Sequence, residues 1–312
     1  MNVLVFGLGA LGTVYSCLLK KSGHRVVALA RGANTQIIRD KGVRITGIWD
    51  EHSARLDNII TGIKQVQEEQ FDLILVTVKS YATVSAARAI TGLVSPGTLV
   101  VLLQNGYGNY ESAAEYIPRE NLVLARVIFG AETIAPGESM VTVIADEVVL
   151  GSPDNTVSGD VLENLAAVFK QAGIPTRTSS EVMKYVWGKI IYNSALNPLG
   201  ALLNVEYGRL AEVEHTRELM DGVISEIFAL LTAMGQETFW PDADAYRDDF
   251  YEKMVPTTAS HHSSMLQDIM RGRMTEIDAL NGAVVSLGRE YGVPTVINEV
   301  ITRMIKAREQ VG

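Results

Sequence analysis

The first twelve residues constrain the fold of this chain more than any other stretch. VLVFGLGALG (residues 3–12) places four apolar residues before Gly7, Gly9 and Gly12. A G-x-G-x-x-G spacing between an apolar strand and a helix is typical of a turn that binds the pyrophosphate of a dinucleotide. The first glycine permits the tight turn, the second lets the pyrophosphate approach the backbone, and the third lets helix and strand pack closely. The alternative is a strand-to-helix turn that binds nothing.

The uncharged stretch from Val3 to Leu19 lacks the features of a targeting segment. No basic residues precede it, glycines interrupt it, and it is short for a membrane-spanning helix. The single cysteine, Cys17, cannot form an internal disulfide, which fits a reducing compartment. The net charge of −9 argues against nucleic-acid binding and against anionic membranes. We therefore expect a cytoplasmic protein with no nucleic-acid or membrane partner; its oligomeric state stays open, a homodimer included.

The remaining pattern predicts an α/β half followed by an all-α half. Short apolar runs alternate with helix-compatible stretches, and the expected strands are residues 2–6, 25–31, 72–79, 98–104, 122–129 and 141–151. Such strands are typical of a parallel, doubly wound sheet that is buried on both faces. Beyond residue 180 only helical periodicity is found, over roughly 181–203, 207–235, 243–253, 259–271, 274–291 and 295–309. The length of 312 residues favours two domains. We predict a Rossmann-type domain over 1–180 and a helical domain over 181–312.

The end of the second strand indicates which dinucleotide binds. An NAD-specific site has an acidic residue there, whereas a 2′-phosphate requires a cation. Here the strand ends in Ala30 and Arg31 with no acidic residue nearby, which predicts NADP(H). Lys79 and Asn105 end two later strands and should lie at the same carboxyl edge of the sheet. The alternative for Lys79 is an ordinary exposed lysine, and the alternative for the segment around Asn105 is a simple turn.

A lysine stands in an apolar helix in the second half. VMKYVWGKIIYNSALNPLGALLN (residues 182–204) is apolar nearly all round, so most of it should be buried. Lys189, Asn193 and Asn197 recur every four residues and form one polar stripe. A buried ammonium requires a ligand or a counter-charge. We expect Pro198 to break the helix and free backbone groups beside the stripe. The alternative is a structural polar seam between helices.

A second polar cluster lies in SHHSSMLQDIMRGRMTEIDALNG (residues 260–282). Ser264 falls at helical spacing with Asp268 and Arg271, and Glu276 begins the next run. The adjacent histidines of this segment point about 100° apart on a helix, which is poor geometry for sharing a metal. We therefore expect no metal site.

Five motifs in this order make the sequence recognisable: GLGALG, a VK at a strand end, QNG, K-x-x-x-N-x-x-x-N-P-L, and S-S-M-L-Q-D followed by T-E-I-D-x-L-N-G. Together they resemble the ketopantoate reductase family, also called 2-dehydropantoate 2-reductases, over nearly the whole chain. The resemblance implies NADPH-dependent reduction of ketopantoate to pantoate, for pantothenate and coenzyme A synthesis. It also implies a Rossmann domain, a helical domain, and an active site in the cleft between them.

The resemblance also implies roles for single residues. Lys189 would be the general acid, Glu276 would meet the cofactor ribose or the lysine, and Ser264 would hold the substrate carboxylate. Asn193 and Asn197 would bind the hydroxyl side of the substrate. The remaining assignments are to the cofactor: Gly7, Gly9, Leu11 and Gly12 to the pyrophosphate, Arg31 to the 2′-phosphate, and Lys79 and Asn105 to its vicinity.

The chemistry of ketone reduction agrees with these assignments. Hydride delivery leaves negative charge on the ketone oxygen, so a cation that also donates a proton suits the site, and Lys189 supplies both. One departure leaves the 2-oxo acid open, because Tyr207 stands where the family pattern has a further substrate-facing asparagine. The alternatives are a reductase of another branched 2-oxo acid and a non-catalytic NADP-binding regulator.

Overall fold

The computed structural model describes residues 1–30, 32 and 35–311, so Arg31 lies outside the described residues. The chain forms two compact units. The first contains residues 1–104 and 109–182, and the second contains residues 105–108 and 183–312. The short segment 105–108 thus packs with the second unit although it lies in the first half of the sequence. The predicted domain boundary at residue 180 stays a prediction.

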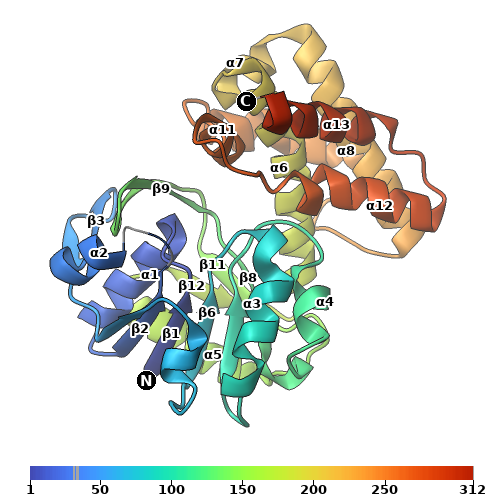
Figure 1. Ribbon diagram of the computed structural model, residues 1–312. Helices are drawn as coiled ribbons and strands as arrows, with labels where there is room; N and C mark the ends of the chain where they lie inside the picture. The colour runs from blue at the N-terminus through green and yellow to red at the C-terminus, as the bar shows by residue number, and fades with distance from the viewer. Residues whose placement is uncertain (31, 33–34, 312) are drawn as a thin grey trace. The chain divides into compact units, whose positions relative to one another are not determined.

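An eight-stranded sheet forms the centre of the first unit (Figure 1). Its strands, in spatial order, are β12 (Thr176–Thr178), β11 (Val148–Gly151), β8 (Leu122–Arg126), β7 (Leu99–Leu102), β6 (Leu73–Val76), β1 (Asn2–Phe6), β2 (Arg25–Leu29) and β5 (Asn58–Ile60). All neighbours are parallel except β8 and β11, which are antiparallel. The central strands are buried along nearly their whole length, as the continuous apolar runs predict. The predicted Rossmann-like α/β class is confirmed.

Helices of the first unit connect these strands. They are α1 (Ala10–Lys21), α2 (Thr35–Lys41), α3 (Thr83–Ile90), α4 (Asn109–Ala114) and α5 (Gly159–Gln171). Helix α1 contacts β1 and β2 on one side and the strands of a second sheet on the other. The core therefore joins residues of three layers, such as Val5 of β1, Cys17 of α1 and Ile45 of the second sheet, all 0% exposed.

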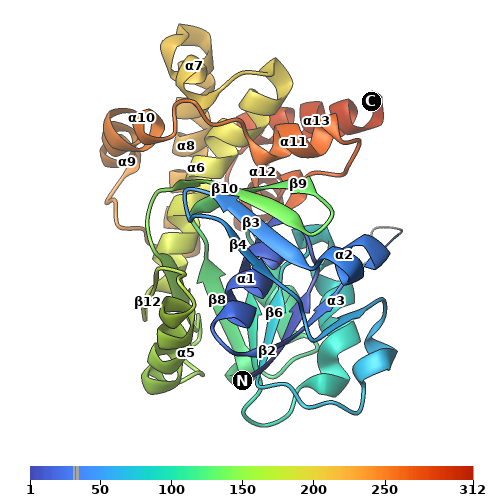
Figure 2. The same ribbon diagram turned by 90° about the vertical axis from the view of Figure 1, so that its left-hand side faces the viewer.

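The second sheet was not predicted. It has four strands in the order β4 (His52–Ala54), β3 (Val43–Gly47), β10 (Glu138–Ile144) and β9 (Phe129–Ala135), which run beside α1 in Figure 2. The single strand expected over 141–151 is wrong, because this run contributes the end of β10 to the small sheet and β11 to the large one. The polar residues between them, Asp146 and Glu147, begin the antiparallel edge.

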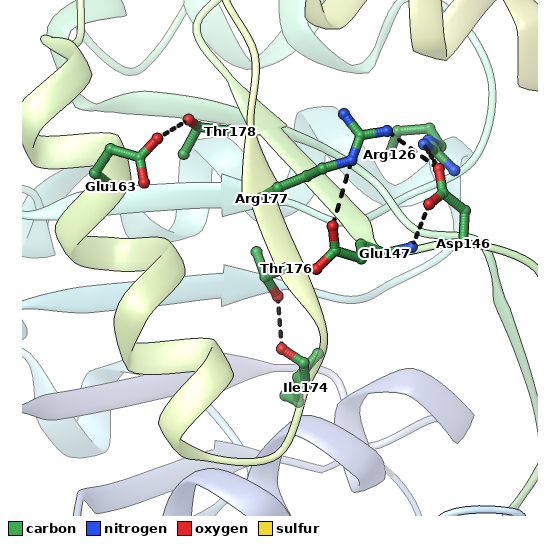
Figure 3. A network of polar contacts seen from close by, with 8 residues as sticks. All are labelled: Arg126, Asp146, Glu147, Glu163, Ile174, Thr176, Arg177 and Thr178. Atoms are coloured by element: carbon green, nitrogen blue, oxygen red, sulfur yellow. Dashed lines mark hydrogen bonds and ion pairs between the residues drawn. The ribbon is translucent and has the colours of Figure 1, made fainter.

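An ion-pair network fixes that edge (Figure 3). The Arg126 side chain is 4% exposed and donates to Asp146 Oδ2 at 2.7 Å, and Arg177 of β12 donates to the same oxygen at 3.2 Å. Partial burial opposes ionisation of Asp146, but the hydrogen bonds from Arg126 and the Glu147 N–H, together with the charges of Arg126 and Arg177, outweigh it and hold the pKa of this carboxyl below its usual value. A buried guanidinium requires such partners. The network therefore joins β8 to the two strands added beyond it.

The second unit is helical. Its helices are α6 (Val182–Leu203), α7 (Tyr207–Glu212), α8 (Glu214–Met234), α9 (Ala243–Asp249), α10 (Val255–Thr257), α11 (Ser264–Met270), α12 (Asn281–Tyr291) and α13 (Val296–Val311). A π-helical turn, Phe250–Met254, joins α9 to α10. Helix α6 is buried nearly all round, as its composition predicts; Trp187, Ile191 and Leu196 are each 0% exposed. No described helix combines the length and the apolar character needed to cross a membrane.

Two predicted helices of this unit are shorter than expected. The helix predicted over 259–271 begins only at Ser264, because the Ser263 side chain caps it by accepting the Leu266 N–H at 3.0 Å. The helix predicted over 274–291 is a short 3₁₀ turn, Ile277–Ala279, followed by α12. Leu280 separates them with a non-helical backbone (ψ of −108°).

The predicted break at Pro198 is wrong. Helix α6 continues through Pro198 to Leu203. A proline inside a helix removes one hydrogen bond, and the carbonyl left without its donor belongs to the residue four positions earlier, here Ser194. Asn281 replaces the missing donor, since its Nδ2 lies 3.0 Å from the Ser194 oxygen. The helix therefore continues because a side chain from another helix satisfies the freed carbonyl.

Candidate active site

The glycine turn lies at the carboxyl end of β1, between the carboxyl ends of β2 and β6. Strand order reverses direction at this point of the sheet, which is where α/β sheets bind ligands. Gly7 has a backbone φ of 118°, a value that residues with a side chain rarely adopt. Its carbonyl accepts a hydrogen bond from the Thr77 hydroxyl at 2.6 Å. A Cβ on Gly12 would lie 1.9 Å from the Gly7 oxygen. Helix α1 therefore approaches the strand end so closely that only glycine fits at position 12.

The second glycine faces open space. Gly9 is the N-cap residue of α1, has no capping side chain, and a Cβ built on it would meet no heavy atom within 4 Å. A helix start with open backbone N–H groups and a positive dipole end is suited to a phosphate group. The turn thus fits a dinucleotide pyrophosphate. Leu11 packs its side chain against the core, so its contact with a phosphate would come from the backbone.

Two further cofactor candidates, Lys79 and Asn105, lie beyond strand ends. Lys79 is half-buried and precedes the short 3₁₀ turn Ser80–Ala82, three residues after β6 ends. Asn105 belongs to the segment 105–108 and groups with the second unit. Arg31, the candidate for a 2′-phosphate, falls outside the described residues.

Asn105 connects the two charged residues predicted for catalysis. The Lys189 ammonium donates to Asn105 Oδ1 at 2.7 Å, and Asn105 Nδ2 lies 3.3 Å from Glu276 Oε2. Glu276 is 7% exposed. One amide thus accepts from the cation and donates to a buried carboxylate, which fixes its orientation. The structure brings Lys189 and Glu276 together through a residue from a distant part of the sequence.

The loop that carries Asn105 is tightly docked. Tyr107 N–H donates to the Ala279 carbonyl at 2.8 Å, and the Tyr107 ring stacks on Trp187 with a centroid distance of 5.1 Å. Gly106 has φ of 90°, and a Cβ on it would lie 2.3 Å from the Ala279 oxygen. These contacts join the loop to α6 and to the turn after Glu276. They explain how Asn105 is held beside Lys189.

The two asparagines of the stripe are nearly buried and only partly used by the protein. Asn193 is 8% exposed, and its amide bonds no residue that the structure describes. Asn197 is 4% exposed and accepts the Tyr207 hydroxyl at Oδ1, while its Nδ2 has no partner within residues 1–30, 32 and 35–311. Buried amides are normally hydrogen-bonded, so open ones beside a lysine indicate a polar ligand.

Ser264 is the first residue of α11 and is half-buried. Its neighbour Ser263 lies 3.8 Å from the position of a Cβ on Gly200, one turn beyond Asn197 on α6. Met265 and Leu266 anchor α11 in a cluster that also contains Ile277, next to Glu276. Helix α11 therefore packs between the end of the stripe and the Glu276 segment.

The sequence did not predict two buried asparagines that hold other groups in place, Asn281 and Asn298. Asn281, 0% exposed, holds the Ser194 carbonyl and also donates to Asn298 Oδ1 at 3.0 Å. Asn298 Nδ2 in turn donates to Glu226 Oε2 at 2.7 Å. Asn281 lies in the T-E-I-D-x-L-N-G motif. The signal available in the sequence was Pro198, because a proline four residues after Ser194 leaves the Ser194 carbonyl in need of another donor.

We expect Asn281→Ala to lower the free energy of unfolding by about 2 kcal/mol, because it leaves two buried acceptors without a donor. Denaturant unfolding of the second unit measures this loss. Pro198→Ala is the matched background. Its N–H at position 198 can bond the Ser194 carbonyl within the helix, so Asn281→Ala should cost less stability there than in the wild-type protein. The same loss in both backgrounds would contradict the role given to Asn281.

Histidine, cysteine and carboxylate side chains do not gather into a group of three or more that fits a metal ion anywhere in the described part of the chain. A Rossmann-like unit with a glycine turn that fits a pyrophosphate, and a helical unit with a lysine held by Asn105 on the same helix face as two asparagines, define a dinucleotide-dependent oxidoreductase. Comparison with known proteins identifies the family.

Two family models match the chain. Ketopantoate reductase PanE/ApbA matches residues 3–155, and Ketopantoate reductase PanE/ApbA C terminal matches residues 181–309. A 2-dehydropantoate 2-reductase from Aquifex aeolicus (strain VF5) is 45% identical over 99% of this chain and 97% of its own length. The chain belongs to the ketopantoate reductase family, whose members are oxidoreductases that use a nicotinamide cofactor.

Solved structures of related proteins share the fold of this chain. A PanE/ApbA family ketopantoate reductase from Ralstonia eutropha JMP134 has a TM-score of 0.87 and 31% identity, covering 100% of this chain and 99% of that one. A D-mandelate dehydrogenase with NADH and anilino(oxo)acetate has a TM-score of 0.89 and 25% identity, with the same coverage. The fold is thus shared by a ketopantoate reductase and a D-mandelate dehydrogenase.

Proposed function

We propose that this protein reduces ketopantoate to pantoate with NADPH. The observation that carries the proposal is the Lys189 ammonium held by Asn105 on the same helix face as two nearly buried asparagine amides. The full-length similarity to 2-dehydropantoate 2-reductases supports the choice of substrate.

Lys189 acts as the general acid. A nicotinamide bound by this protein would supply the hydride for the ketone carbon. Negative charge then grows on the ketone oxygen, and the Lys189 ammonium stabilises it and donates a proton to it. An ammonium has three N–H groups, so its bond to Asn105 is compatible with a second bond to the substrate.

Asn105 and Glu276 position this acid. Asn105 Oδ1 holds the nitrogen of Lys189, and the bond from Asn105 Nδ2 to Glu276 prevents the amide from turning over. The buried Glu276 carboxylate places negative charge near the ammonium, which reduces the free-energy cost of keeping it charged.

The substrate is held by neutral groups. The described part of the chain leaves the Asn193 amide and the Asn197 Nδ2 open to the hydroxyl side of ketopantoate. The Ser264 hydroxyl binds the carboxylate without adding a second buried cation. The three side chains come from α6 and α11, which pack together.

The cofactor is NADPH in this proposal. The turn of Gly7, Gly9 and Gly12 holds the pyrophosphate, with Leu11 contributing its backbone N–H and Lys79 lying nearby. Strand β2 ends at Leu29, and no acidic residue follows at positions 30 to 34. A negative 2′-phosphate is therefore not repelled there, and Arg31 supplies the matching charge.

Arg31→Asp is expected to weaken NADPH more than NADH. The Michaelis constant for NADPH should rise at least about 10-fold, because a charge-assisted bond is replaced by repulsion. NADH, which has no 2′-phosphate, is the internal control and should change by less than about 2-fold. Equal losses with both cofactors would contradict the role of Arg31.

A panel of 2-oxo acids tests the proposed function. We expect kcat/KM with NADPH to be at least about 10-fold higher for ketopantoate than for 2-oxoisovalerate or pyruvate, since only ketopantoate offers the hydroxyl. The similarity to D-mandelate dehydrogenase favours one alternative, a reductase of a different 2-oxo acid. Phenylglyoxylate belongs in the panel for this reason. A cytoplasmic location and a homodimer stay predictions.

A further inference from the structure

The turn after α6 carries Tyr207 back onto the polar stripe. Asn204 has φ of 54°, and Val205 N–H donates to the Gly200 carbonyl at 3.2 Å. Asparagine tolerates this left-handed conformation better than most residues. The chain therefore reverses within a few residues, and α7 begins at Tyr207.

Tyr207 is fixed on several sides. It is 3% exposed, and its N–H donates to the His261 carbonyl at 3.1 Å. Its ring lies edge-on to Tyr192 and to the His261 ring, with centroid distances of 6.0 and 5.4 Å. Burial raises the pKa of Tyr207 well above its usual value, so its hydroxyl stays protonated.

The Tyr207 hydroxyl selects one orientation of the Asn197 amide. It donates to Asn197 Oδ1. An amide has an accepting oxygen and a donating nitrogen, so occupation of the oxygen turns the nitrogen the other way. No described residue accepts from that nitrogen. Asn197 therefore offers a ligand only N–H donors.

We infer that Tyr207 is a positioning residue that sets substrate specificity: it holds the Asn197 amide so that Nδ2 donates to the hydroxyl oxygen of the substrate. The inference rests on the proposed function, because it requires a hydroxylated 2-oxo acid at the stripe. Tyr207 does not touch the substrate in this account, and it acts through Asn197.

The test compares ketopantoate with 3,3-dimethyl-2-oxobutanoate, which has the same carbon skeleton without the hydroxyl. We expect Tyr207→Phe to lower kcat/KM for ketopantoate about 10-fold, mainly through KM, because the amide is free to turn over. The analogue should change by less than about 2-fold. Asn197→Ala should lower the preference for ketopantoate similarly, and Tyr207→Phe should add nothing to it.

Tyr192→Phe is the matched control. Tyr192 is a neighbouring tyrosine whose hydroxyl bonds Thr258 instead of the stripe, so its removal should leave the preference for ketopantoate unchanged. Equal losses on both substrates after Tyr207→Phe, or additive losses with Asn197→Ala, would overturn the inference while leaving the proposed function intact. A wild-type protein that does not reduce ketopantoate would overturn both.

Discussion

Replacing Lys189 with alanine is expected to lower kcat for ketopantoate by about 10³-fold or more. The variant loses the proton donor and the positive charge that stabilises the developing alkoxide, and a general acid alone contributes about 10²–10⁴-fold. NADPH binding, measured by fluorescence titration, should change little, because the glycine turn lies in the other compact unit.

Lys189→Arg is the matched variant for this test. Arginine keeps the charge, but it does not give up a proton and its planar group does not reproduce the ammonium contact with Asn105. We expect it to recover only a small part of the lost kcat. A Lys189→Ala protein with near-normal turnover would remove this residue from the mechanism.

Gly12→Ala is expected to destabilise the first unit by about 3 kcal/mol or more, because the added Cβ would overlap a backbone oxygen that cannot move away cheaply. Gly9→Ala should change stability by less than about 1 kcal/mol, since nothing lies within 4 Å of its Cβ and its backbone is extended. Thermal and denaturant unfolding of both variants measure the difference.

The same pair separates folding from binding. Gly9→Ala should weaken NADPH at least about 10-fold, because its methyl group occupies the space into which the pyrophosphate approaches. A stable Gly9→Ala protein that binds NADPH normally would show that the cofactor phosphates do not lie against this turn.

Features encoded in contiguous sequence were predicted well. The strand, turn and helix around Gly7 to Gly12 form from one short segment, and the α/β class followed from buried apolar runs. The stripe of Lys189, Asn193 and Asn197 followed from helical spacing alone, because α6 is a single long helix.

Features that depend on distant residues were not predicted. Asn105 meets Lys189 across 84 positions of sequence, and its loop is held by the Ala279 carbonyl. Pro198 fails to break α6 because Asn281, 87 positions after Ser194, supplies the missing hydrogen bond. The small sheet forms because β3 (Val43–Gly47) pairs with β10 (Glu138–Ile144), a segment far along the chain, and its edge strand His52–Ala54 is too short to be recognised from sequence.

The product of the reaction tests the central claim most directly. Purified protein is incubated with ketopantoate and NADPH, and the products are identified by NMR. We expect one pantoate for each NADPH oxidised in the wild-type protein and a rate lower by about 10³-fold in Lys189→Ala. Ketopantoate left unchanged by the wild-type protein, or pantoate formed equally fast by Lys189→Ala, would contradict the account.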